Sequence, residues 1–196
     1  MIMAYSIPLL MMLAGISQSA WTESSKRGGA DYNQTWCAST ERIYFSCLIG
    51  RKTVSLCGAD RITKTEGYLQ YRFGRLGKEA ELVYPLAQVH PRVGFRDYMD
   101  LGAQSRLYEI SFEHGEFEYT LFDDYAAQVP TYGAGIFVGK TGGTLRMLGC
   151  TGKMRADITQ IFRMYDEKVL VRQTGDAAKS RFMLQNNQRE LLKFFK

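Results

Sequence analysis

Residues 43–74 of this chain read IYFSCLIGRKTVSLCGADRITKTEGYLQYRFG, and this stretch decides the fold. Residues 43–49 alternate apolar side chains on one face and are rich in β-branched and aromatic residues, as strands are. The chain reverses at Gly50-Arg51-Lys52 and returns through residues 53–57, which predicts a β-hairpin. A third strand is expected at residues 68–73.

The predicted third strand has one apolar and one polar face, the pattern of a sheet with one buried side. Its apolar positions are Leu69, Tyr71 and Phe73. Its polar positions are Tyr68, Gln70 and Arg72. Tyrosine and arginine are enriched at binding hot spots, so we expect this polar face to be exposed and to form a binding surface. An ordinary solvent-facing strand has the same pattern, and this alternative stays open.

The rest of the chain repeats this pattern of short strands and tight turns. Residues 107–121 predict a second hairpin that turns at His114-Gly115, and residues 135–148 predict a third. We interpret residues 86–106 as a long connection between sheets and residues 123–132 as a polar loop. The expected fold is mainly β, a β-sandwich or open barrel of about eight antiparallel strands.

The hydrophobic period changes after Cys150. Apolar residues recur at helical spacing over residues 154–165, which predicts an amphipathic helix that packs on a sheet. A second helical face is expected from Ser180 onward. The fold therefore includes one or two C-terminal helices, and the basic second helix would either dock on the sheet or lie on a membrane surface.

The N-terminus indicates export. Residues 1–19 form an uncharged stretch with an apolar run over residues 7–16, as in a secretory signal peptide. We expect residues 20–40 to be a flexible mature N-terminus, residues 41–172 a β-rich domain and residues 173–196 a helical tail. No later segment is apolar enough to cross a membrane, so the expected location is the periplasm or the extracellular space.

The charge of the chain does not point to nucleic acid. The sequence has 25 lysines and arginines against 20 aspartates and glutamates, a net charge of +5. Charges of both signs alternate along the chain and do not form basic blocks, so we expect no nucleic-acid partner.

The four cysteines predict two disulfides, because an exported chain with an even number of cysteines normally pairs them. They are Cys37, Cys47, Cys57 and Cys150. We expect Cys47–Cys57 across the first hairpin and Cys37–Cys150 between the ends of the domain. A hairpin register shifted by one residue would instead send Cys47 and Cys57 to opposite faces. No C-x-x-C or paired histidine accompanies them, so no metal site is expected.

Three further patterns invite a chemical interpretation. Residues 133–141, GAGIFVGKT, resemble a nucleotide-binding loop but have the wrong glycine spacing and no following helix, so we expect a hairpin and no cofactor. His90 and His114 stand apart from any nucleophile motif, and no catalytic residue is predicted from them. Asp123 and Asp124 are candidate binding residues or a carboxylate pair for glycoside hydrolysis. Adjacent aspartates on an extended chain point to opposite sides, which favours a solvated acidic loop.

The chain resembles small exported, periplasmic β-rich proteins of Gram-negative bacteria to which no activity is assigned. The resemblance spans roughly residues 43–150 and lies in the following motifs: Phe45-Ser46-Cys47, Gly50, Lys52, Val54 to Cys57, Tyr71-x-Phe73-Gly74, Glu81-Leu82, Pro85, Phe112, Gly115, Tyr119, Gly135 and Leu148-Gly149-Cys150. It implies export and a β fold.

We therefore expect a non-enzymatic periplasmic protein that binds a protein of the envelope. An immunity protein or inhibitor directed at a secreted toxin or envelope enzyme is the most concrete form of this hypothesis. Two alternatives remain open: an envelope hydrolase that uses carboxylates of residues 113–124, and a binding module for cell-wall sugar or lipid.

Overall fold

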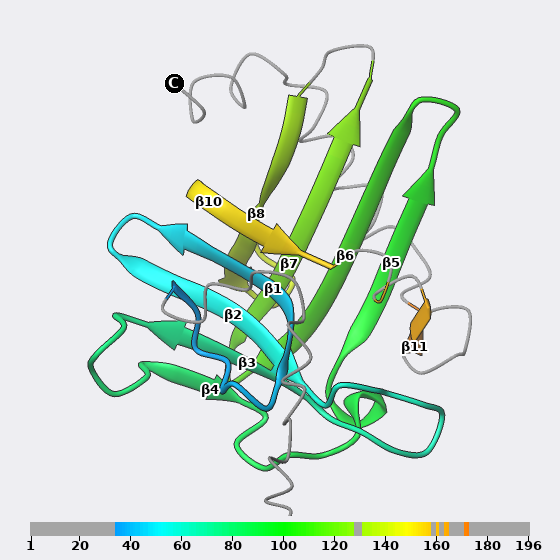
Figure 1. The fold of residues 1–196 in the computed structure, drawn as a ribbon. Coiled ribbons are helices and arrows are strands. Elements are labelled where there is room, and N and C mark those ends of the chain that lie inside the picture. The colour runs from blue at the N-terminus through cyan, green and yellow to red at the C-terminus, as the bar shows by residue number, and fades with distance from the viewer. Residues whose placement is uncertain (1–33, 128–130, 158–159, 161–162, 165–170, 173–196) are drawn as a thin grey trace, which may run out of the picture. The chain divides into compact units, whose positions relative to one another are not determined.

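The computed structural model describes residues 34–127, 131–157, 160, 163–164 and 171–172. The predicted signal peptide and the predicted helical tail lie outside these residues. The described chain is mainly β and forms two sheets, here called sheet A and sheet B (Figure 1). No helix in the described part of the chain is long and apolar enough to cross a bilayer.

Sheet A has five strands in the order β10-β1-β2-β3-β4, and all neighbours are antiparallel. Its strands are β1 (Arg42–Ile49), β2 (Lys52–Gly58), β3 (Leu69–Gly74), β4 (Leu82–Tyr84) and β10 (Thr151–Ala156). The turn between β1 and β2 uses Gly50 at a φ of 62°, a conformation that favours glycine. A bulge at Tyr44 shifts the register of β1 on β2, so that Tyr44 and Phe45 are both buried.

Sheet B has six strands in the order β11-β5-β6-β7-β8-β9. Its strands are β5 (Arg96–Leu101), β6 (Ser105–His114), β7 (Phe117–Ala126), β8 (Thr131–Lys140), β9 (Arg146–Gly149) and β11 (Val171–Arg172). Strand β11 runs parallel to β5, and the other neighbours are antiparallel. The long strands β6, β7 and β8 form the centre of the sheet.

The described strands change sheet three times along the chain: between β4 and β5, between β9 and β10, and between β10 and β11. Residues 85–95 lead from β4 in sheet A to β5 in sheet B and include a short 3₁₀ helix, η2 (Pro91–Val93). The chain returns at Cys150, which lies between β9 of sheet B and β10 of sheet A. Figure 1 shows β10 beside β1, across the strands of sheet B.

A shared hydrophobic core joins the inner faces of the two sheets. Phe112 of β6 lies at its centre: its ring stacks on Tyr84 of β4 at a centroid distance of 4.5 Å and on Tyr119 of β7 at 4.9 Å. Tyr71 of β3 packs against the same ring at 4.9 Å. Tyr71 was predicted to lie on the apolar face of its strand, and this prediction is confirmed.

The two disulfides form, but with a different pairing from the expected one. The bonds are Cys37–Cys57 and Cys47–Cys150, and no free cysteine remains among the described residues. The register places Val54, and not Cys57, opposite Cys47, because the turn has two residues. Cys47 therefore lies in the core and joins β1 to the crossing between the sheets, while Cys57 points to the outer face of sheet A. The predicted Cys47–Cys57 bridge is wrong for this reason.

Three predicted segments differ from the structure. The expected connection of residues 86–106 contains β5, and the expected loop of residues 123–132 is largely the ends of β7 and β8. The helix expected over residues 154–165 was predicted to start too early, because residues 151–156 form β10 against β1. Of the remainder of that helix, the described residues 160 and 163–164 are helical.

The glycine-rich stretch of residues 133–141 lies in β8 and its turn, so the hairpin interpretation is confirmed. A side chain at Gly135 would collide with the carbonyl oxygen of Leu148 on the neighbouring strand. The glycine is needed for close strand packing, and the chain continues from β8 through a turn into the antiparallel strand β9.

Candidate functional site

The outer face of β3 carries a closed polar cluster. Tyr68, Gln70 and Arg72 lie together on this face, as expected, but Gln70 is only 5% exposed. Residues 34–41 cover the face, and Cys37–Cys57 ties this segment to β2. The expectation that the face is open to solvent is therefore wrong, because a segment from before the first strand lies on it.

Glu41 is the centre of this cluster. Arg72 donates to both of its carboxylate oxygens, at 2.6 and 2.7 Å, and the Tyr68 hydroxyl and the Ala38 backbone N–H donate at 2.8 and 2.7 Å. Burial alone raises the pKa of Glu41, but the hydrogen bonds from Arg72, Ala38 and Tyr68 together hold it below the usual 4.5. Glu41 is thus an ionised carboxylate that accepts hydrogen bonds from Arg72, Tyr68 and Ala38.

Arg72 also fixes the side chain of Gln70. Its guanidinium donates to the Gln70 Oε1 atom from Nε at 2.9 Å and from Nη2 at 2.6 Å. Because Oε1 accepts these bonds, the amide Nε2 points the other way and donates to the carbonyl oxygens of Pro85 at 2.9 Å and Leu86 at 3.1 Å. The ion pair is therefore connected, through one amide, to the connection between the two sheets.

Residues 85–93, here called the 85–93 loop, are held at further points. Beside the loop, burial together with its bond to Glu41 raises the pKa of Tyr68 to about 12. The His90 Nε2 atom donates to the carbonyl oxygen of Thr63 at 3.0 Å, while its Nδ1 accepts from the Arg92 N–H at 3.3 Å. Gln70 of the polar cluster and the His90 side chain thus hold the loop in place.

This fixed loop displays two apolar side chains to solvent. Leu86 is 85% exposed and Val93 is 76% exposed, the two highest values among the large hydrophobic residues described. Pro91 between them is buried and anchors the loop from below. The exposed side chains are therefore held on an ordered backbone.

The two aspartates are not part of this site. Asp123 and Asp124 are consecutive in β7 of sheet B, so they point to opposite faces of the sheet. Asp123 is buried, and burial raises the pKa of Asp124 although the Tyr125 N–H partly offsets it. The candidate binding residues therefore do not form one site. Tyr68, Gln70 and Arg72 lie together on sheet A, whereas Asp123 and Asp124 lie on opposite faces of sheet B.

The neighbouring glutamates are engaged on the surface. Glu113 accepts from exposed Arg96 at 2.9 Å, and Glu116 pairs with Lys140 at 3.2 Å. The described part of the chain contains no group of three or more histidine, cysteine, aspartate or glutamate side chains that could hold a metal ion.

Glu41 is the residue that the sequence analysis missed. It precedes β1 by one position and lies 31 residues from Arg72, with no periodic pattern between them. The signal that brings it to β3 is the Cys37–Cys57 bond, which places the whole segment on sheet A.

Comparison of the chain with protein-family models, with curated proteins and with solved structures gave no match.

Proposed function

We propose that this chain is a non-enzymatic binding protein of the periplasm or the extracellular space, built on a β-sandwich, and that the 85–93 loop contacts a protein partner. The observation that supports it is the combination of nearly full exposure at Leu86 and Val93 with an anchored backbone. Burial of one such side chain by a partner contributes about 1.5–3 kcal/mol of favourable free energy to binding.

The anchoring matters because association normally costs the entropy of ordering interface loops. Hydrogen bonds made by Gln70 and His90 have already ordered this loop in the free protein. The binding surface predicted on β3 thus contributes indirectly, by holding the loop and not by touching the partner.

The loop also indicates the chemistry of its partner. Its sequence, PLAQVHPRV, has no acidic residue and includes the exposed Arg92 beside Val93. A complementary surface would offer an apolar recess with an acidic rim. A secreted toxin or an envelope enzyme that this protein inhibits, with the chain acting as its immunity protein, is the specific form that we propose. The two disulfides support a location in an oxidising compartment.

The test uses capture of the partner by the full-length, oxidised protein. A photo-crosslinking amino acid replaces Gln88, on the same loop, in three proteins: the wild type, the double variant Leu86→Ser/Val93→Ser and the control Leu101→Ser. Each protein is then irradiated in periplasmic extract. Leu101 is a matched control because it is 53% exposed at the end of β5. Mass spectrometry identifies the product, and its affinity is then measured with the purified partner.

We expect the double variant to lose at least tenfold in affinity and the Leu101 variant to bind as the wild type does. Both variants should have nearly the melting temperature of the wild type, since exposed substitutions change the free energy of unfolding by only about 0.5 kcal/mol. Equal affinity of the double variant and the wild type would refute the proposed site.

A further inference from the structure

A separate pocket lies at the end of the β1–β2 hairpin that is opposite its turn. Its volume is about 280 Å³, near the lower end of the roughly 300–1,000 Å³ of small-molecule sites. It is lined by Arg42, Tyr44, Asp60, Arg61, Ile62, Gln160, Arg163 and Met164. The buried side chains of Tyr44, Ile62 and Met164 belong to the hydrophobic core and form a firm base.

The arginines of this pocket are not equivalent. Arg42 is already committed, because its guanidinium donates to Asp157 Oδ2 at 2.7 and 3.1 Å and lies 3.9 Å from Asp60. Arg61 and Arg163 are exposed, and no carboxylate of the described residues forms an ion pair with either. Two guanidinium groups therefore remain to bind a ligand.

The lining has an excess of positive charge and few competing acceptors. Three arginines face one carboxylate, that of Asp60. Tyr44 offers no spare donor, since its hydroxyl donates to the carbonyl oxygen of Ala59 at 2.7 Å. Guanidinium groups bind carboxylates and phosphates through two parallel hydrogen bonds, and the Gln160 amide can add a further donor.

We propose that this pocket binds a small organic oxyanion, a carboxylate or a phosphate ester with a compact apolar group, and that Arg61 and Arg163 hold its charge. The apolar group would rest on Ile62 and Met164. Arg42, whose guanidinium is held by Asp157, shapes the wall and does not take part in charge recognition. The site is distinct from the 85–93 loop and does not depend on the function proposed above.

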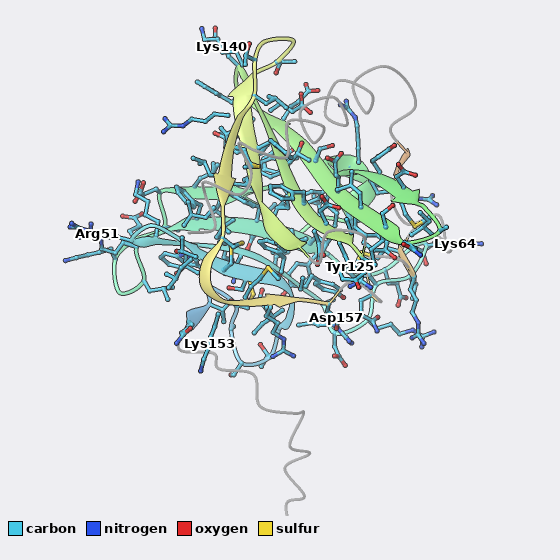
Figure 2. All side chains as sticks on the ribbon, turned by 90° about the horizontal axis from the view of Figure 1, so that it is seen from above. Arg51, Lys64, Tyr125, Lys140, Lys153 and Asp157 are labelled. Carbon is cyan, nitrogen blue, oxygen red and sulfur yellow. A yellow bond between two sulfur atoms is a disulfide. The ribbon has the colours of Figure 1, made fainter. Side chains whose placement is uncertain are left out.

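The probes for this site are benzoate and phenyl phosphate, with benzyl alcohol as the neutral analogue. Each is titrated into the full-length oxidised protein by calorimetry at about 150 mM salt, where charges beyond about 8 Å are screened. The variants are Arg61→Gln, Arg163→Gln and the control Arg51→Gln. Arg51 projects from the tip of the hairpin, away from Asp157 (Figure 2).

We expect saturable binding of at least one anion and none of benzyl alcohol. Each pocket variant should weaken binding about tenfold or more, as the loss of a charged hydrogen bond does, while Arg51→Gln leaves it unchanged. The tighter of the two anions identifies the head group. No saturable binding of either anion, unchanged affinity in both pocket variants, or an equal loss in Arg51→Gln would overturn the proposal.

Discussion

The buried ion pair between Glu41 and Arg72 gives the sharpest test of the structure. Their side chains are 4% and 15% exposed, and the Arg72→Met variant would leave the Glu41 carboxylate buried without its guanidinium partner. Removing one partner of a buried pair typically costs about 3–5 kcal/mol, because the remaining charge is uncompensated. We expect a loss of stability of that size at pH 7.

The control is the exposed pair Arg96–Glu113, whose side chains are 48% and 45% exposed at a separation of 2.9 Å. Solvent screens such a pair, so Arg96→Met should cost no more than about 1 kcal/mol. The assay is urea denaturation of each oxidised protein, followed by circular dichroism. In addition, the Glu41→Gln/Arg72→Met double variant should show a coupling of roughly 0.5–3 kcal/mol.

The pH dependence provides a second readout of the same pair. In the wild type the pKa of Glu41 is lowered, so its contribution to stability is present above the unfolded pKa of about 4.3 and is lost as the pH falls through the folded value. In Arg72→Met, burial without the cation should raise this pKa, and acid should then favour the folded state at this site. The difference between the two proteins should shrink from pH 7 to pH 3.5. Equal losses in Arg72→Met and Arg96→Met, or a difference independent of pH, would refute the reasoning.

Four other predictions concern the disulfides, the core and export. Non-reducing peptide mapping should recover Cys37 linked to Cys57 and Cys47 linked to Cys150, whereas a Cys47–Cys57 peptide would contradict the hairpin register. Removing the Cys47–Cys150 bond, which spans 103 residues, should cost about 4.7 kcal/mol in urea titrations, against about 3 kcal/mol for Cys37–Cys57, which spans 20. Tyr71→Ala should cost about 3–5 kcal/mol, since its ring is buried against the central aromatic stack, and a loss below 1 kcal/mol would argue against that core. Finally, intact-mass measurement should show that periplasmic protein has lost the apolar N-terminal leader, and a full-length cytosolic chain would contradict export.

Alternation along single strands was the part of the fold that the sequence could predict. Leu69 and Tyr71 were assigned to a buried face from local pattern alone, because a period of two is a property of one strand. Strand β5 was missed because its sequence, RDYMDL, shows no such alternation. It is a strand because it pairs with β6 along its whole length, and tertiary pairing outweighs local preference.

The candidate site was predictable to a similar extent. The pattern of β3 identified Tyr68 and Gln70 as partners on one face, but not what lies on that face. Residues 34–41 cover this face because Cys37 bonds to Cys57. The sequence does not reveal that pairing, since four cysteines allow three pairings. The exposure of Leu86 could not be predicted either, since the local sequence around an apolar residue after a proline does not indicate whether it is buried.

The Cys47–Cys150 bond also determines how the molecule would respond to mechanical force. A pull applied at the two ends of the chain would pass from β1 through this bond directly to β10, since Cys150 immediately precedes that strand. The segment between the two cysteines, which are 103 positions apart, would lie outside the path of tension. Roughly 350 Å of extended chain would thus stay inaccessible to stretching until a reductant opens the bond.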